Sequence, residues 1–210
     1  LDESIAVKRA QGSNLDKNTI IGKTLSFILM SHSLMSLVRK YVRNGDKVLM
    51  VTNPAPLVLL MSRLKKSIDF ELNILVHDVF PENTVPAGLR LPMYGSIKRM
   101  FDKAYAKADQ LIVLGRDMQE VIMKKVEKGS KPKGNSPRIS VIENWADIEN
   151  IKPQPMPEEK IILEYAGNIG RVQGLDNIIN NLPSDVEFHI YGTGSMENTL
   201  KRMNHPRAIF

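Results

Sequence analysis

The sequence contains no cysteine and only one tryptophan among its 210 residues. Without cysteine the chain can form no disulfide framework, no thiolate zinc site and no thiol nucleophile. This absence fits a reducing compartment. The remaining composition, with 42% hydrophobic and 25% charged residues, is that of an ordinary soluble globular protein and argues against a disordered chain.

Long hydrophobic runs are also missing, since no stretch reaches the roughly 18 consecutive apolar residues that cross a bilayer. The most apolar run, residues 24–38, contains His32 and several serines, and we expect it to form a buried helix. The chain has neither an initial methionine nor a signal-peptide pattern, and it stops within the apolar run 207–210. Both ends predict a fragment that lacks its beginning and its end.

Acidic residues are outnumbered in the first part of the chain. The formal charge is +6, but residues 1–151 carry 23 Lys and Arg against 16 Asp and Glu, whereas residues 152–210 carry 6 against 7. This skew suggests nucleic acid, a phosphorylated ligand or an anionic membrane as partner. The cluster 98–138, with 11 basic and 5 acidic residues, is either a solvated face or a contact for anionic lipid or a pyrophosphate-bearing acceptor. Nucleic acid is disfavoured because the cluster has few aromatic side chains to stack on bases.

Short apolar runs alternate with longer segments of helical period. Predicted strands cover residues 48–51, 73–76, 110–114 and 139–142, and predicted helices cover 57–66, 96–108 and 117–126. The stretch 147–160 interrupts this rhythm with three prolines and several acidic residues, as expected of an interdomain linker. The alternation then restarts, with strands 160–166, 186–191 and 207–210 and helices 175–181 and 196–203.

Strands and helices that alternate in this way form parallel sheets with right-handed crossovers. We therefore expect an α/β protein of two doubly wound lobes. Residues 1–150 form the first lobe, 151–159 the linker and 160–210 the start of the second lobe. In open α/β sheets, ligands bind beyond the carboxyl ends of the strands, so candidate site residues are sought there.

Polar residues follow three strand ends of the expected first lobe. They are Thr52–Asn53–Pro54, His77–Asp78 and Glu143–Asn144–Trp145. His77 is either a structural histidine or a catalytic one that faces the cleft between the lobes. Trp145 is expected to pack under the linker.

The turn after the strand 160–166 is rich in glycine. Gly167, Gly170 and Gly174 let the backbone approach a ligand closely, and the helix that follows offers free N–H groups to an anion. Arg171 adds a planar donor fork suited to phosphate. The pattern predicts either a phosphate site or a tight turn with a surface arginine, and it is neither the dinucleotide-binding spacing nor a P-loop.

A second glycine turn, with Gly192 and Gly194, follows the strand 186–191. Taken alone, this turn is better explained as the start of a helix capped by Ser195. Two glycine turns at neighbouring strand ends favour a shared ligand.

Five stretches together carry a family resemblance. They are residues 45–56, 76–82, 141–147, 165–175 and 191–194. In this order, and over nearly the whole chain, they resemble the retaining glycosyltransferases of family four, which have the GT-B fold. The sequence is most similar to bacterial enzymes of O-antigen or capsule synthesis, such as those assigned as fucosamine transferases. The motifs are specific to the family but not to a sugar.

The resemblance implies two Rossmann-like lobes, both incomplete here, of which the first binds the acceptor and the second the nucleotide-sugar donor. In the family, a Gly-Arg and a Lys-Gly pair commonly bind the donor diphosphate, at the spacing of Gly167–Asn168 and Gln173–Gly174. Here Asn168 replaces the Arg and Gln173 the Lys, while Arg171 supplies one positive charge between them. The expected donor site is completed by Gly170, Gly192 and Gly194.

The implied reaction transfers a sugar from a nucleoside diphosphate with retained anomeric configuration. The resemblance places His77 or Asp78 beside the donor sugar. On the cleft or acceptor side it places Asn53, Glu82 and Asn144. Because no metal-ligand cluster is visible, we expect a metal-independent, cofactor-free enzyme in which Arg171, N–H groups and helix dipoles meet the charge of the leaving diphosphate.

The expected substrates are a nucleotide sugar, with UDP as the first choice of nucleotide, and a polyprenyl-diphosphate-linked or saccharide acceptor. We expect a cytoplasmic protein without a nucleic acid partner, and peripheral contact with the anionic inner face of the plasma membrane stays open. Two alternatives also stay open: a sugar-nucleotide epimerase of similar fold, and a nucleotide-sugar binding module that has lost catalysis. The 210-residue chain alone is expected to be inactive and poorly soluble, because a partial second lobe exposes the unpaired edge of its truncated sheet.

Overall fold

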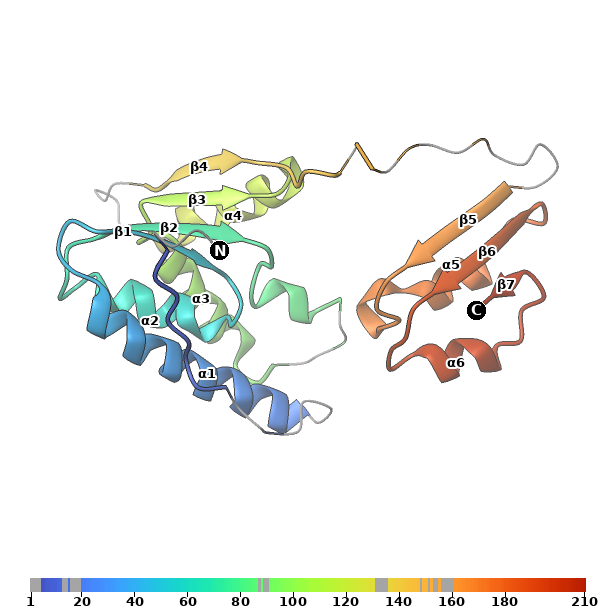
Figure 1. Ribbon diagram of the computed structural model, residues 1–210, viewed down its shortest axis with the longest axis horizontal. Helices are drawn as coiled ribbons and strands as arrows, with labels where there is room; N and C mark the ends of the chain where they lie inside the picture. The colour runs from blue at the N-terminus through green and yellow to red at the C-terminus, as the bar shows by residue number, and fades with distance from the viewer. Residues whose placement is uncertain are drawn as a thin grey trace. The chain divides into compact units, whose positions relative to one another are not determined.

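The computed structural model describes residues 5–12, 15, 20–86, 88, 91–130, 136–147, 149, 150, 152, 155 and 161–210. The chain divides into two compact units, Leu1–Trp145 and Ala146–Phe210, whose helices and strands are drawn in Figure 1. Each unit has its own parallel sheet and its own hydrophobic core. Most of the expected linker, 151–159, lies outside the described residues.

The first unit is built on a four-stranded parallel sheet in the order β1-β2-β3-β4. The strands are β1 (Lys47–Val51), β2 (Glu71–Val76), β3 (Gln110–Val113) and β4 (Arg138–Val141). The helices are α1 (Ile20–Tyr41), α2 (Pro56–Leu64), α3 (Tyr94–Tyr105) and α4 (Arg116–Gly129), with a short 3₁₀ turn η1 (Glu82–Thr84). The predicted α/β class with parallel sheets is confirmed.

One face of this sheet forms the core. Alternate residues of β2 and β3, such as Ile74 and Leu111, are fully buried, and the buried side chains of all four helices join them in a single cluster. Neighbouring helices in the sequence also contact one another in space, α1 with α2, α2 with α3 and α3 with α4 (Figure 1). On the opposite face β1 leaves Leu49 and Val51 exposed, by 65% and 41%.

Helix α1 is longer and less buried than residues 24–38 predict. Leu25, Ile28 and Leu29 are 40–48% exposed, whereas Ser26 and Ser31 are buried. Ser31 is accommodated because its hydroxyl donates a 2.6 Å hydrogen bond to the carbonyl of Phe27, one turn earlier. The prediction of a buried helix was therefore wrong for Leu25, Ile28 and Leu29, which face outward.

The second unit repeats the pattern on a smaller scale. Its parallel sheet has the order β5-β6-β7, made of β5 (Ile161–Ala166), β6 (Val186–Tyr191) and β7 (Ala208–Ile209). The connections hold η2 (Arg171–Gln173), α5 (Leu175–Asn180) and α6 (Glu197–Arg202). Ile179, Phe188 and Leu200 lie at the centre of its core.

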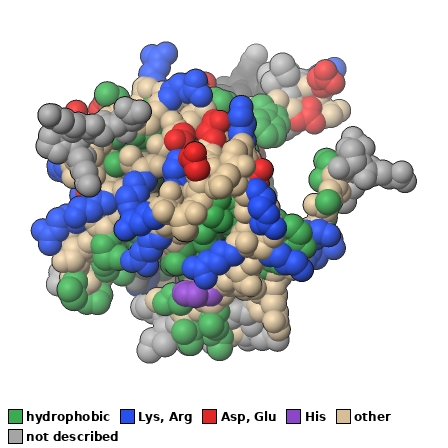
Figure 2. Space-filling model, turned by 90° about the vertical axis from the view of Figure 1, so that its left-hand side faces the viewer, with side chains coloured by type: hydrophobic (Ala, Val, Ile, Leu, Met, Phe, Trp, Pro, Cys, Tyr) green, Lys and Arg blue, Asp and Glu red, His purple; other side chains and the backbone are tan. Residues whose placement is uncertain are grey.

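The surface is rich in cationic side chains. Lys and Arg are spread over much of the face shown in Figure 2, whereas Asp and Glu gather in small patches. In the part of the chain that the structure describes, no helix combines the length and the apolar character needed to cross a membrane.

Candidate functional site

The carboxyl ends of β1 and β2 are tied together by one hydroxyl group. Thr52, the residue after β1, is 3% exposed, and its Oγ1 accepts hydrogen bonds from the backbone N–H groups of His77 and Asp78, both at 3.2 Å. The chain is thus held as it leaves β2. The side chains of His77, Asp78 and Asn53 remain exposed at this edge of the sheet, where the sequence predicts a site.

The loop that begins at His77 is packed against α3. The ring of Phe80 lies 4.7 Å from that of Phe101, measured between centroids, with the two planes at 59°. One turn further on, the buried hydroxyl of Thr84 donates a 2.7 Å hydrogen bond to the carbonyl of Pro81. These contacts keep the loop close to the body of the unit.

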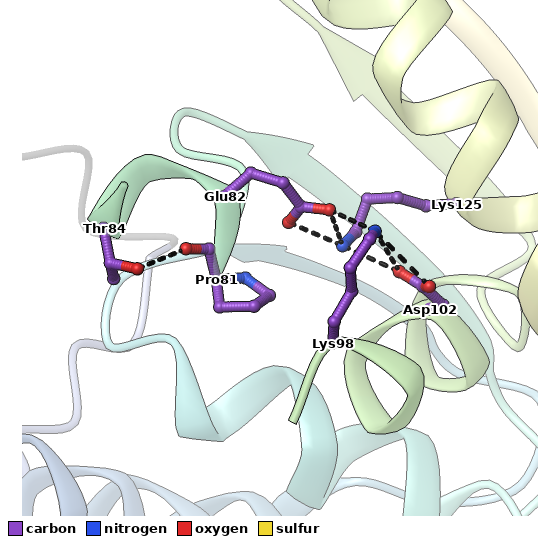
Figure 3. A network of polar contacts seen from close by, with 6 residues as sticks. All are labelled: Pro81, Glu82, Thr84, Lys98, Asp102 and Lys125. Atoms are coloured by element: carbon purple, nitrogen blue, oxygen red, sulfur yellow. Dashed lines mark hydrogen bonds and ion pairs between the residues drawn. The ribbon is translucent and has the colours of Figure 1, made fainter. Parts of the chain in front are cut away.

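A buried network of two lysines and two carboxylates lies beneath this loop (Figure 3). The ammonium of Lys125, on α4, is 2.8 Å from both carboxylate oxygens of Glu82 and 2.8 Å from Oδ1 of Asp102, on α3. Lys98 also contacts Glu82, and it lies 3.3 Å from Oδ1 of Asp102. The side chains of Lys125 and Asp102 are only 1% and 4% exposed, whereas those of Lys98 and Glu82 are 27% and 25% exposed, so the network is buried on one side and reaches water on the other.

The charges of this network stabilise one another. Burial tends to raise the pKa of Glu82, but hydrogen bonds from Lys125 and Lys98 outweigh it, and the pKa is lowered from its ordinary value. Burial likewise opposes the charge of Lys98, but the bond to Glu82 outweighs it and the pKa is raised. The carboxylate of Glu82 is therefore ionised and occupied by protein cations, a geometry that favours a structural role over contact with an acceptor.

Of the basic cluster 98–138, Lys125 thus belongs to the protein interior and Lys98 is half-buried against it, rather than on a fully solvated face. At the carboxyl end of β4, in contrast, residues 143–147 are all exposed. Asn144 is exposed, and its contact with an acceptor stays a prediction. Trp145 is 91% exposed, so the prediction that it packs under the linker was wrong; no described side chain covers it.

In the second unit the two predicted glycine turns form one hydrogen-bonded structure. The N–H of Gly167 donates to the carbonyl of Tyr191 at 2.9 Å, and that of Ile169 donates to Thr193 at 2.9 Å. The N–H of Met196 returns a 3.0 Å bond to the carbonyl of Ile169. The residues that the sequence assigns to a shared ligand site are therefore brought together at the carboxyl ends of β5 and β6.

The glycines of the second turn are required by this contact between the turns. A Cβ atom at Gly192 would lie 1.9 Å from the carbonyl oxygen of Gly167, and one at Gly194 would lie 2.2 Å from that of Ile169. Gly192 also has a φ of +143°, which side chains rarely tolerate. The close approach that these glycines allow is thus between two backbone segments of the protein itself.

Two amide side chains converge on Gly170. A Cβ atom there would lie 2.7 Å from Oε1 of Gln173 and 2.8 Å from Nδ2 of Asn168. The hydroxyl of Tyr165 donates a 2.8 Å hydrogen bond to the carbonyl of Asn168 and so braces the turn. Asn168, Gln173 and Arg171 are all exposed, and they present two amides and one guanidinium at this edge.

The helices after these turns are short. Gly174 has a φ of +59° and immediately precedes α5, which has only six residues and therefore contributes little dipole. Helix α6 also has six residues, and Met196, without a side-chain cap, stands at its start. The predicted cap by Ser195 was wrong, because the helix begins one residue later than such a cap requires.

The described residues include no group of three or more His, Asp or Glu side chains placed to hold a metal ion. Metal independence stays a prediction. Two open hollows of about 560 and 580 Å³ lie elsewhere on the first unit, lined by residues such as Arg39 and Lys65, and neither contains a predicted site residue.

Sequence reasoning missed the residues that support the loop after β2. Thr52 stood in a predicted motif, but nothing indicated that its hydroxyl would hold two backbone N–H groups. A signal for Lys125 was present: it lies three residues after Ile122 and one before Val126, so helical spacing puts it on the buried face of α4. A lysine on such a face requires a buried carboxylate partner.

No model of a known protein family matches the chain. In an alignment that covers 89% of this chain, the sequence is 33% identical to the protein of Pseudomonas aeruginosa named "Probable glycosyltransferase WbjE". The match covers 49% of that protein, so the chain spans about half of its length. The chain is thus similar to a glycosyltransferase along most of its own sequence.

Proposed function

We propose that this chain is part of a glycosyltransferase that moves a sugar from a nucleoside-diphosphate donor to a lipid-linked or saccharide acceptor. The observation that carries the proposal is the 33% identity with a protein named as a glycosyltransferase, over 89% of the chain. The resemblance noted in the sequence adds the finer features: membership of family four, retention of configuration and a place in cell-surface polysaccharide synthesis.

The donor diphosphate is assigned to the second unit. The exposed amide side chains of Asn168 and Gln173, together with the guanidinium of Arg171, can hydrogen-bond phosphate oxygens. Asn168 and Gln173 donate without charge, so the site relies on hydrogen bonds and a single cation. UDP is the nucleotide expected first, and no metal or further cofactor is required in this proposal.

The first unit supplies the groups that act on the sugar and the acceptor. His77 and Asp78 are proposed as the polar residues nearest to the reaction, and Asn53 and Asn144 as acceptor contacts. Glu82 is assigned to the support of the loop, because Lys125 and Lys98 already occupy its carboxylate. The basic surface of this unit suits a pyrophosphate-bearing acceptor or the anionic inner face of the plasma membrane, which implies a cytoplasmic location.

A binding module without catalysis is the second candidate. Asn168 and Gln173 are neutral, whereas the resembling enzymes commonly have Arg and Lys at these positions. The loss of two positive charges favours weaker binding of a diphosphate. An epimerase of similar fold would need no acceptor and no basic acceptor-side surface.

Thermal-shift titration of the complete gene product with UDP, GDP and their sugars tests donor binding. A midpoint that rises with nucleotide concentration supports the donor site and identifies the base. Release of the nucleoside diphosphate that depends on an added lipid-linked acceptor then supports transfer. Binding without turnover would favour the binding module, isomerisation of the sugar nucleotide without acceptor would favour the epimerase, and no response to any nucleotide would overturn all three.

A further inference from the structure

The loop after β2, residues 77–86, is attached to the first unit at three places. Thr52 holds its first two backbone N–H groups, the ring of Phe80 packs on Phe101, and the carboxylate of Glu82 joins the network on α3 and α4. We call this segment the β2 loop. The third attachment differs from the other two, because it joins four charged groups, of which Lys125 and Asp102 are buried and Glu82 and Lys98 are about a quarter exposed.

A charged attachment is a costly way to gain stability alone. Desolvation of buried ions cancels much of their attraction, and well-packed apolar residues often stabilise a fold as well or better. What buried ion pairs add is a defined orientation of the charged side chains. The ammonium of Lys125 contacts both oxygens of Glu82 and one of Asp102, each at 2.8 Å, which fixes the carboxylate in position and orientation.

This position is significant because of what the β2 loop carries. His77 and Asp78 are its first residues, and they lie at the carboxyl edge of the sheet, where ligands of such folds bind. Residue Glu82 follows them by a few positions, with Phe80 packed between. A shift of the carboxylate would therefore be transmitted over a short, well-packed segment to both polar side chains.

We propose that Lys125 and Asp102 are positioning residues that act through Glu82, holding the β2 loop so that His77 and Asp78 keep their orientation during sugar transfer. The proposal rests on the proposed glycosyltransferase function. In this scheme the reacting atoms are not in contact with Lys125, Asp102 or Glu82. The network contributes to rate through geometry rather than through its charge on the substrate.

The first test is kinetic and uses Glu82→Gln in the complete gene product. This substitution keeps the shape of the side chain but removes the charge that two lysines hold. We expect kcat to fall on the order of 10- to 100-fold, as a displaced active-site group typically causes, with the KM for the nucleotide sugar unchanged. Glu71→Gln is the matched control, since Glu71 forms an exposed 3.7 Å pair with Lys47 at the opposite end of the strands, and it should keep wild-type kcat.

The second test reads the loop directly, by hydrogen exchange. In Glu82→Gln the amides of residues 77–86 should exchange faster, while those of β3 and of the second unit keep their wild-type rates. Lys125→Met, which removes the ammonium but keeps an unbranched side chain, should give the same local change if it folds. Glu82 is partly exposed, so Glu82→Gln disturbs the core less than Lys125→Met does. If Lys125→Met does not fold, Glu82→Gln alone provides the test.

The outcomes separate this inference from the proposed function. Wild-type kcat and wild-type exchange in Glu82→Gln would overturn the inference. Faster exchange throughout the first unit, with KM and kcat both altered, would also overturn it in favour of a purely structural role. If the wild-type protein transfers no sugar, the proposed function fails, and the exchange pattern alone still decides whether the network positions the loop.

Discussion

At the scale of single residues, the buried lysines and carboxylates of the first unit make its stability depend on pH. Burial raises the pKa of Glu82, and hydrogen bonds from Lys125 and Lys98 outweigh this and lower it. A carboxyl with a lowered folded-state pKa stabilises the fold fully above its unfolded value of 4.5, and this contribution is lost as pH falls through the folded pKa. Lys98, with a raised pKa, contributes below 10.5 and loses its contribution as pH rises through the folded value.

We therefore expect acid to destabilise the wild-type protein more steeply than Glu82→Gln. Below pH 4.5 the free energy of unfolding of the wild type should include the protonation of Glu82, which glutamine cannot undergo. Urea denaturation of the complete protein at a series of pH values measures both slopes. If the free energy of unfolding fell equally steeply with pH in the wild type and in Glu82→Gln below pH 4.5, the lowered pKa of Glu82 would be contradicted.

The same residues mark the limit of what the sequence predicts at this scale. His77, Asp78 and the glycine turns are predicted as site residues because their types and their places after strands carry a chemical meaning. The roles of Thr52, Asp102 and Lys125 were not predicted, because they depend on partners distant in the chain. Lys125 meets Glu82 43 residues away, a separation that no local pattern encodes.

At the scale of elements, strand and helix positions were predicted well because periodicity is local. Residues 186–191 form β6 as predicted, and α2 occupies 56–64 where 57–66 was expected. Burial was predicted less well. In α1 Ser26 and Ser31 are buried while Leu25 and Leu29 are exposed, and only tertiary packing decides between the two faces of a helix that is apolar nearly all round.

The contact between the two glycine turns leads to a prediction at this scale. Gly192→Ala should force its Cβ atom onto the carbonyl oxygen of Gly167, 1.9 Å away, and separate the turns. We expect a loss of about 1–3 kcal/mol in the stability of the second unit, typical of overpacking, and a weaker thermal shift with nucleotide.

Gly95→Ala is the matched control for this substitution. Gly95 lies in α3 of the first unit, where an added Cβ would meet nothing within 4 Å, and alanine is favoured over glycine in helices. Calorimetry and nucleotide titration of both variants provide the comparison. Equal nucleotide responses in Gly192→Ala and wild type would remove the paired turns from the proposed donor site.

At the scale of the whole molecule, each unit presents a parallel sheet with its buried side chains gathered on one face. In the first unit β1 is the edge strand of the described sheet, and its Leu49 and Val51 are exposed on the other face. An edge strand with exposed apolar side chains is a template for pairing with another chain. The sequence predicts poor solubility from the truncated sheet of the second lobe, and β1 of the first unit is a further exposed edge that this expectation did not include.

We expect the 210-residue chain, expressed alone, to self-associate through β1, and Leu49→Lys to reduce this association. A lysine on an edge strand disfavours further pairing, and Leu49, 65% exposed, is the least buried apolar residue of β1. Size-exclusion chromatography with light scattering measures the mass over a range of concentrations. Met123→Lys adds the same charge at a 48% exposed position on α4 and should leave the mass unchanged. A monomeric wild-type chain would refute the expectation, and an equal effect of both lysines would assign the association to net charge rather than to the exposed strand.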